Sequence, residues 1–185
     1  RRMSELLNLM TTRRSVRRFR PEAPPREVLE LLVAAAVTAP SASNRQPWRF
    51  VIVRSAERIA ALAAAVRQEV DLIARHIDPA SEAPFRAYGD YFTRFCGAPV
   101  VIAVLFHDAP VLSHLALGSL PVDSRGRVRA MERDSGLIGA ALALQNLLLR
   151  AHELGLGASG MTGPLVAEDR LRALLEVPPS WGIAA

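Results

Sequence analysis

The chain is most informative between residues 40 and 48, which read Pro-Ser-Ala-Ser-Asn-Arg-Gln-Pro-Trp. Before this stretch, apolar residues recur at helical spacing from Pro25, a good helix start, to Pro40. After it, residues 49–54 (Arg-Phe-Val-Ile-Val-Arg) are strand formers. The stretch is rich in small hydrogen-bonding residues and is stiffened by its prolines. It therefore predicts either a loop that presents amide and hydroxyl groups to a flat, heteroatom-rich ring or an ordinary polar turn before a buried Trp48.

Helical and strand patterns are interspersed along the rest of the chain. Further helices are expected over residues 4–12, 55–77, 136–154 and 167–175. The helix over 136–154 is the most apolar, so we expect it at the centre of the core. Further strands are expected over 98–106, buried on both faces, and from 183 to 185. A linker is expected over 79–84 and a loop over 107–133. Between them, aromatic residues at mainly helical spacing over 85–95 are expected to pack in the core, with stacking on a ligand as the alternative. These elements complete a single domain, residues 1–185, of class α+β.

Length and composition favour an ordinary globular protein. A chain of 185 residues fits one domain with a sizeable core, and half of its residues are hydrophobic. Its one cysteine, Cys96, allows no internal disulfide, which favours the cytoplasm as the expected location. No apolar run approaches the roughly 20 residues that span a bilayer, and no secretory signal is visible, so no membrane association is expected. No metal site is predicted, because the histidines have no metal-ligand spacing.

The net charge of +5 suggests nucleic-acid binding, but the distribution of charge argues against it. All 23 basic residues are arginines, which indicates a compositional bias, and they are scattered except in residues 13–20. That cluster contains Arg13-Arg14-Ser15-Val16-Arg17, whose guanidinium and hydroxyl groups are suited to one phosphate group. The alternative for the cluster is a solvated basic turn. We expect no nucleic-acid partner.

A third motif lies near the C-terminal end. Gln145-Asn146-Leu147 stands in the apolar helix, and residues 155–163 read Gly-Leu-Gly-Ala-Ser-Gly-Met-Thr-Gly. Residues 155–160 match G-x-G-x-x-G, but they follow a helix rather than a strand, so they are not a dinucleotide fingerprint. Glycines still allow the backbone to approach a ligand closely.

The three motifs in this order resemble the nitroreductase family, over residues 13 to 181. The resemblance implies a nitroreductase-like fold, with a mostly antiparallel central sheet flanked by helices. It also implies an interlocked homodimer with two flavin mononucleotide (FMN) molecules at the subunit interface. The family continues with a further strand, a Gly-Tyr-Pro sequence and a basic residue that reaches the phosphate, and this C-terminal part lies outside the printed sequence.

The resemblance also implies a set of cofactor-binding residues. Three sets of residues are expected around the FMN. The first holds the phosphate, the ribityl chain and the pyrimidine edge, the second is a loop from the partner subunit, and the third lies against the flavin ring. They are Arg13, Arg14, Ser15 and Arg17; Pro40, Ser41, Ser43, Asn44 and Gln46; and Met161, Thr162 and Gly163. Arg94 is a weaker candidate for a carbonyl of the flavin's pyrimidine ring.

The implied activity is ping-pong hydride transfer from NAD(P)H through FMN to nitroaromatic, quinone or related small-molecule acceptors. Because the cofactor would perform this transfer, no catalytic acid, base or nucleophile is expected among the side chains. Specialised relatives that fragment flavin, oxidise azolines or dehalogenate aromatics are an alternative, as is a flavin-binding protein without turnover. Against flavin fragmentation, residues 41–46 differ from the Gly-Phe-Met-Gln type of loop that is seen in those relatives.

Overall fold

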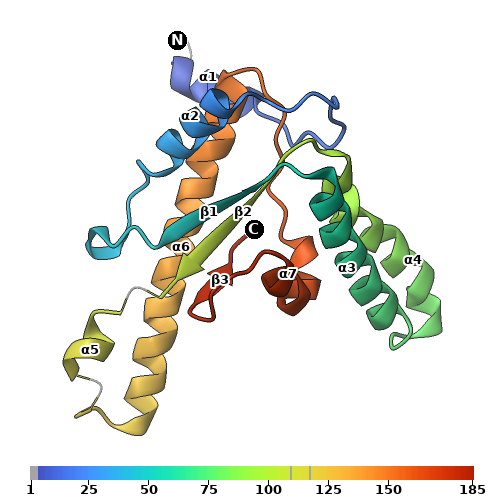
Figure 1. The fold of residues 1–185 in the computed structure, drawn as a ribbon. Coiled ribbons are helices and arrows are strands. Elements are labelled where there is room, and N and C mark those ends of the chain that lie inside the picture. Colours follow the sequence, from blue (N-terminus) through green and yellow to red (C-terminus); the bar gives the residue numbers. More distant parts are fainter. Residues whose placement is uncertain (1–3, 109, 117) are drawn as a thin grey trace.

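A computed structural model describes residues 4–108, 110–116 and 118–185. It contains a three-stranded sheet in the order β1-β2-β3, formed by β1 (Trp48–Val53), β2 (Val101–His107) and β3 (Trp181–Ile183). Both pairs of strands are antiparallel, with Trp48 opposite Phe106 and Val53 opposite Val101 in the first pair. The expected α+β class with an antiparallel sheet is therefore confirmed (Figure 1).

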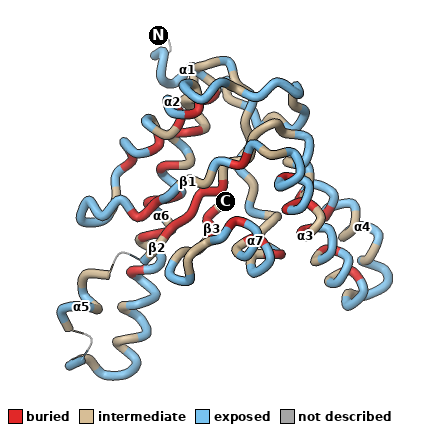
Figure 2. Tube along the Cα trace, viewed as in Figure 1, coloured by how far each residue is buried: buried red, intermediate tan, exposed pale blue. Residues whose placement is uncertain are grey.

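Helices cover both faces of the sheet, and the alternation of side chains in β2 explains why. Val104 and Phe106 belong to a core cluster with α2 (Arg26–Ala36) and α6 (Val122–Glu153). Ala103 and Leu105 belong to a second cluster with α3 (Ala56–Ala74) and α7 (Glu168–Leu174). Successive residues of a strand point to opposite faces, so both faces of β2 are buried, as Figure 2 shows.

The remaining elements are short helices at the edges of these layers. They are α1 (Glu5–Thr12), α4 (Pro79–Gly89) and α5 (Leu112–Ala116), with the 3₁₀ segments η1 (Ala42–Asn44), η2 (Asp90–Gly97) and η3 (Gly163–Ala167). The helices expected at residues 4–12, from 25, from 55 and from 167 are confirmed, with ends that shift by a few residues. The hydroxyl group of Ser55 accepts a hydrogen bond from the Arg58 amide at 3.2 Å, so Ser55 caps α3.

The structure corrects the position of the apolar helix. The buried face of α6 consists mainly of small residues, including Gly136, Gly139, Ala140 and Ala143. A Cβ atom at Gly136 would lie 2.2 Å from the carbonyl oxygen of His107, so α6 lies directly on the end of β2. Its opposite face carries Ile138, which is 60% exposed. The helix is therefore buried along one face rather than at the centre of the core.

The predicted loop over 107–133 is wrong. α5 lies within it, and α6 begins at Val122 rather than at Gly136. Residues 122–130 of α6 are mostly exposed (Figure 2), and charged or small residues predominate among them, so they have no apolar periodicity to reveal a helix. Ala109 and Leu117, which fall in the predicted loop, lie outside the described residues.

The predicted linker over 79–84 is also wrong, because these residues form the start of α4. Asp78 caps this helix by accepting a hydrogen bond from the Ala80 amide at 3.1 Å, and Pro79 occupies the first turn, where proline is tolerated. Arg86 pairs with Glu82 and with Asp71 of α3, so tertiary ion pairs support the helix despite Pro84. Of the aromatic residues that follow, Phe92 is buried in the core as expected, whereas Tyr88 and Tyr91 are exposed.

Candidate functional site

The structure brings the basic motif and the glycine-rich motif together. Residues 13–17 run beside residues 156–158, and a parallel bridge joins Ser15 to Ala158. The amide of Val16 donates a hydrogen bond to the carbonyl oxygen of Ala158 at 3.0 Å. Two segments more than 140 residues apart in the sequence thus form one surface.

Two glycines explain why this contact forms. Gly155 has φ +74°, a left-handed conformation that favours glycine, and it turns the chain at the end of α6. The Leu156 amide then donates to the carbonyl oxygen of Ala151 at 2.8 Å. A Cβ atom at Gly157 would lie 2.7 Å from Cγ1 of Val16, which is closer than side chains pack, so Gly157 permits the close approach.

The arginines of the basic motif differ in their surroundings. Arg14 donates to the carbonyl oxygens of Thr11 at 2.7 Å and of Arg13 at 2.9 Å, so its guanidinium binds the C-terminal end of α1. Within the described part of the chain, no carboxylate lies within ion-pair distance of Arg13 or Arg17. Arg17 makes one long hydrogen bond, to the carbonyl oxygen of Ser15 at 3.4 Å. The guanidinium groups of Arg13 and Arg17 are thus largely available to an anion, and the exposed Ser15 lies between them in the sequence.

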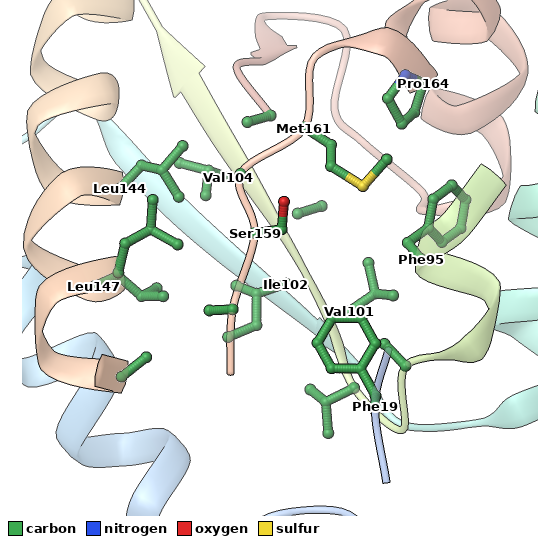
Figure 3. Close-up of a pocket in the computed structure, with 18 of the residues that line it drawn as sticks. Phe19, Phe95, Val101, Ile102, Val104, Leu144, Leu147, Ser159, Met161 and Pro164 are labelled. Atoms are coloured by element: carbon green, nitrogen blue, oxygen red, sulfur yellow. The ribbon is translucent and has the colours of Figure 1, made fainter. Parts of the chain in front are cut away.

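An apolar cavity of about 230 Å³ borders both segments (Figure 3). Its lining includes residues 100–104, which lead into β2 and form its first part, and Figure 3 shows Phe19, Phe95, Leu144 and Met161 around it. Among the described residues that line it, Arg17 and Arg94 are the charged ones. The cavity thus suits a largely apolar body with an electron-rich or anionic edge.

Ser159 is the polar side chain in the middle of this cavity (Figure 3). Its Oγ atom is buried and has no hydrogen-bond partner in the described part of the chain. A buried hydroxyl without a partner costs about 1–3 kcal/mol, so a group that enters the cavity and bonds to Ser159 gains affinity. Sequence reasoning missed Ser159, because a serine between glycines in a loop is not distinctive.

The segment 161–163 closes one side of the cavity. The Met161 side chain points into it, as Figure 3 shows. A Cβ atom at Gly163 would lie 2.2 Å from the ring of Phe92, so only glycine fits against this buried ring. Thr162, between them, is exposed. This segment therefore has a fixed course past the cavity.

The loop before β1 has an unusual backbone. Ser43, Asn44 and Gln46 have φ of 52°, 51° and 47°, a region that residues other than glycine rarely adopt. Ser41 holds this course, since its carbonyl oxygen accepts from the Asn44 amide at 3.0 Å and its hydroxyl from the Gln46 amide at 2.9 Å. Such strained positions cluster at binding sites, so the loop is a candidate ligand-binding element.

In this single chain the loop lies apart from the other two motifs. It packs on α6, where a Cβ atom at Gly139 would lie 3.1 Å from the side chain of Pro47. None of the described residues that line the cavity comes from the loop, and Figure 1 shows it at the start of β1, away from α1. The residues Pro40, Ser41, Ser43, Asn44 and Gln46 are therefore brought together with each other, but not with Arg13, Arg17 or Met161.

Asn146, in the third motif, has a structural partner. Its side-chain amide donates to the hydroxyl group of Thr38 at 3.2 Å and to the carbonyl oxygen of Ala35 at 3.4 Å. This contact ties α6 to the end of α2.

In the described residues, no group of three or more potential metal ligands gathers, and no helix combines the length and apolarity needed to cross a membrane.

Comparison with known proteins identifies the family. The model of the nitroreductase family matches residues 10–185, and the chain belongs to this family. It is 31% identical to a 5,6-dimethylbenzimidazole synthase of Rhodobacter capsulatus, over 97% of this chain and 80% of that protein. It is 29% identical to an NADH dehydrogenase of Thermus thermophilus, over 94% of this chain and 80% of that protein.

Solved structures confirm the nitroreductase-like fold. A BluB-like flavoprotein of Clostridium difficile superposes with a TM-score of 0.81 at 23% identity, over 98% of this chain and 87% of that one. A nitroreductase with bound FMN from Desulfitobacterium hafniense superposes with a TM-score of 0.70 at 22% identity, over 99% of this chain and 86% of that one. At these identities the likeness establishes the fold alone.

Proposed function

We propose that this protein binds FMN and transfers hydride from NAD(P)H to an electron-poor acceptor such as a nitroaromatic or a quinone. The observation that carries the proposal is the contact between residues 13–17 and 156–158 beside an apolar cavity. It puts Arg17 at a cavity suited to an aromatic ring and Arg13 in the segment that borders it. In the described residues, neither guanidinium group has a carboxylate within ion-pair distance. The FMN-bound relative of the same fold and the family's oxidoreductases support this choice of ligand.

The residues present fit FMN. Arg13, Ser15 and Arg17 would bind the phosphate group and the polar edge of the cofactor, with guanidinium groups that stay charged at any physiological pH. Arg14 would contribute charge rather than direct contact, because its side chain binds carbonyl groups of α1. Met161, Thr162 and Gly163 would lie along the ring system, on a segment whose course Phe92 fixes.

When bound, FMN supplies the hydride chemistry, which no side chain of the site can supply by itself. The part of the protein is then to bind, to orient and to exclude water. The arginines would stabilise negative charge on the reduced cofactor, and the apolar walls would strengthen that interaction by keeping water away. NADH as donor is supported by the name of the Thermus thermophilus relative.

We further propose that two copies of the chain form a homodimer that completes each site. The strained loop with Ser43, Asn44 and Gln46 lies apart from the cavity in one chain, so a second copy would have to supply it. The exposed apolar residues of α1 and α6 are available for such an interface; they include Leu6, Met10, Met131, Ile138 and Leu142.

Anaerobic reduction tests the proposed function. Purified protein should retain FMN or rebind it when the cofactor is added. Addition of NADH or NADPH should bleach the flavin absorbance at about 450 nm, and excess donor should reduce the bound flavin completely. An acceptor such as a quinone should restore the colour. If NADH or NADPH bleaches the flavin but no acceptor restores its colour, the protein catalyses a different reaction. If the protein retains FMN but neither donor bleaches it, the protein binds flavin without turnover.

A second candidate activity is flavin fragmentation. It is favoured by the similarity to the 5,6-dimethylbenzimidazole synthase, which extends over 97% of this chain. Incubation of the protein with reduced FMN and oxygen, followed by chromatography for 5,6-dimethylbenzimidazole, separates the two. Formation of that product would replace hydride transfer to an external acceptor as the proposed function.

A further inference from the structure

The aromatic segment before β2 contains two tyrosines whose exposure needs an explanation. Phe92 is buried, and its ring supports Gly163. Tyr88 and Tyr91 are 63% and 45% exposed, although tyrosine rings usually contribute to a core or to an interface. The ring of Tyr88 packs edge-on against Phe92, with 4.9 Å between centroids. Tyr91 has another neighbour.

The guanidinium group of Arg94 stacks on Tyr91. Its central carbon lies 3.8 Å from the ring centroid, well within the range of a cation–π contact. Within the described residues no carboxylate pairs with Arg94, so the ring is the group that restrains this long side chain. A guanidinium held over an aromatic ring keeps its charge, and its N–H donors, which lie in the guanidinium plane, remain free to bind an acceptor. Tyr91 therefore fixes the orientation of Arg94 without neutralising it.

Arg94 also lines the apolar cavity. Among the described lining residues, the charged ones are Arg94 and Arg17, and none is acidic. It lies in η2 (Asp90–Gly97), the segment that supports Gly163 through Phe92. One short segment thus holds both a cation at the cavity and the backbone of residues 161–163. A displacement of the Tyr91 ring would release the cation but leave Phe92 in place.

We infer that Tyr91 is a positioning residue, which holds the Arg94 guanidinium at the cavity so that it can donate to the electron-rich edge of a bound flavin. This inference rests on the proposed function. It assigns to Tyr91 no contact with the flavin itself. Because the stack depends on the ring and not on the phenol hydroxyl, phenylalanine should replace tyrosine without loss.

Four variants test this inference: Tyr91→Phe, Tyr91→Leu, Arg94→Gln and the double variant Tyr91→Leu/Arg94→Gln. The dissociation constant of FMN, from quenching of flavin fluorescence, should be unchanged in Tyr91→Phe and raised roughly two- to fivefold in Tyr91→Leu, which is the factor for about 0.5–1 kcal/mol. Arg94→Gln should raise it at least as much. The double variant should resemble Arg94→Gln, because Tyr91 acts through Arg94.

The midpoint potential of the bound flavin separates positioning from general packing. Loss of a nearby cation disfavours the negatively charged reduced flavin, so Arg94→Gln and, to a smaller extent, Tyr91→Leu should shift the potential to more negative values. Tyr88→Leu, a neighbouring exposed ring without a stacked arginine, is the matched control and should leave the potential unchanged. Thermal unfolding of each apoprotein shows whether the variant is folded.

The outcomes are distinct. Tyr91→Leu equal to the parent in both affinity and potential, or Tyr91→Phe as damaging as Tyr91→Leu, would overturn the positioning role and leave the proposed function standing. A parent protein that binds no FMN would overturn the proposed function, and the inference with it. If Tyr91→Phe matches the parent, and if Tyr91→Leu and Arg94→Gln change the FMN affinity and the midpoint potential as predicted, the result supports both the positioning role and the proposed function.

Discussion

At Gly157 the glycine-rich segment approaches Val16 so closely that a single methyl group would force the two segments apart. Gly157→Ala should therefore destabilise the fold by about 1–3 kcal/mol through overpacking and should also weaken FMN binding, because the arginines move with Val16. Equilibrium unfolding and flavin titration measure the two effects.

Two controls belong to this prediction. A Cβ atom at Gly160, in the same segment, would meet only ordinary contacts with Leu144 and Leu148 at 3.6 Å, so Gly160→Ala should be nearly neutral. Val16→Ala in the Gly157→Ala background should restore much of the binding by making room. An unchanged affinity in Gly157→Ala would mean that the contact does not position the arginines.

Arg13 and Arg17 are predicted to hold the FMN phosphate. The double variant Arg13→Ala/Arg17→Ala should lose most of the affinity, since each hydrogen bond to a charged group is worth about 1.5–3 kcal/mol. Arg18→Ala/Arg20→Ala removes the same charge from exposed positions nearby. At physiological ionic strength, where salt screens charges that make no contact, it should retain FMN almost as well as the parent. Equal retention by both double variants in equilibrium dialysis would contradict the phosphate assignment.

At this scale, sequence reasoning marked two segments that meet in the structure, but it did not predict how their side chains are held. The order of the motifs in the chain marked residues 13–17 and 155–163, and these segments do meet. That Arg14 binds the end of α1, and that Ser159 lies unpaired in a cavity, depends on contacts between distant segments. Such contacts leave no trace in local spacing or composition.

Among the elements, α5 depends on a single side chain of α6. Glu132 is 4% exposed, and its carboxylate accepts hydrogen bonds from the amides of Val111 at 2.7 Å and Ser113 at 3.1 Å. Burial alone would raise the pKa of Glu132, but these bonds, together with those from the Ser113 hydroxyl and the Leu112 amide, lower it from 4.5 to about 2.

This lowered pKa predicts how α5 responds to acid. A carboxylate with a lower pKa in the folded state contributes stability above its unfolded pKa, and the contribution is lost as the pH falls from about 4.5 to about 2. NMR signals of the Val111 and Ser113 amides should shift over this range, while those of the sheet core move less. In Glu132→Gln the acid transition of these signals should disappear and α5 should be less protected at neutral pH. If the acid transition persists in Glu132→Gln, another group causes it. The control is Glu153→Gln, which changes an exposed carboxylate at the far end of the same helix and should leave the transition in place.

The elements that sequence patterns missed share a physical reason. A helix shows in a sequence when one face is apolar, and residues 122–130 have no such face because they contact little. α4 was missed because of its prolines, which a capping aspartate and the ion pairs of Arg86 offset. The strands and the well-packed helices were predictable, because burial imposes the periodicity that reveals them.

For the whole molecule, the arrangement of the three motifs decides what a single chain can do. The basic and glycine-rich segments meet at one cavity, whereas the strained loop packs on α6 elsewhere. A backbone held in the left-handed region at three residues costs on the order of 1–3 kcal/mol for each. Such a cost is expected to persist where a ligand makes use of it, which supports the proposal that a second copy brings this loop to the flavin.

The homodimer is thus tested most directly on α6. Met131, Ile138 and Leu142 lie at intervals of seven and four residues, which places them on one face of this helix, and all three are exposed in the single chain. Ile138→Asp puts a charge in the middle of this face and should convert a dimer into monomers, because burial of an unpaired carboxylate is far more costly than its exposure. Light scattering after size exclusion measures the mass. The control Leu72→Asp, which changes another exposed apolar residue, on α3, should leave the mass unchanged. If the loop of the second copy completes the site, the monomeric variant should also lose FMN although its own Arg13 and Arg17 are intact. A monomeric Ile138→Asp that binds FMN like the parent would show that one chain suffices, and a parent protein that is itself monomeric would rule out the shared site.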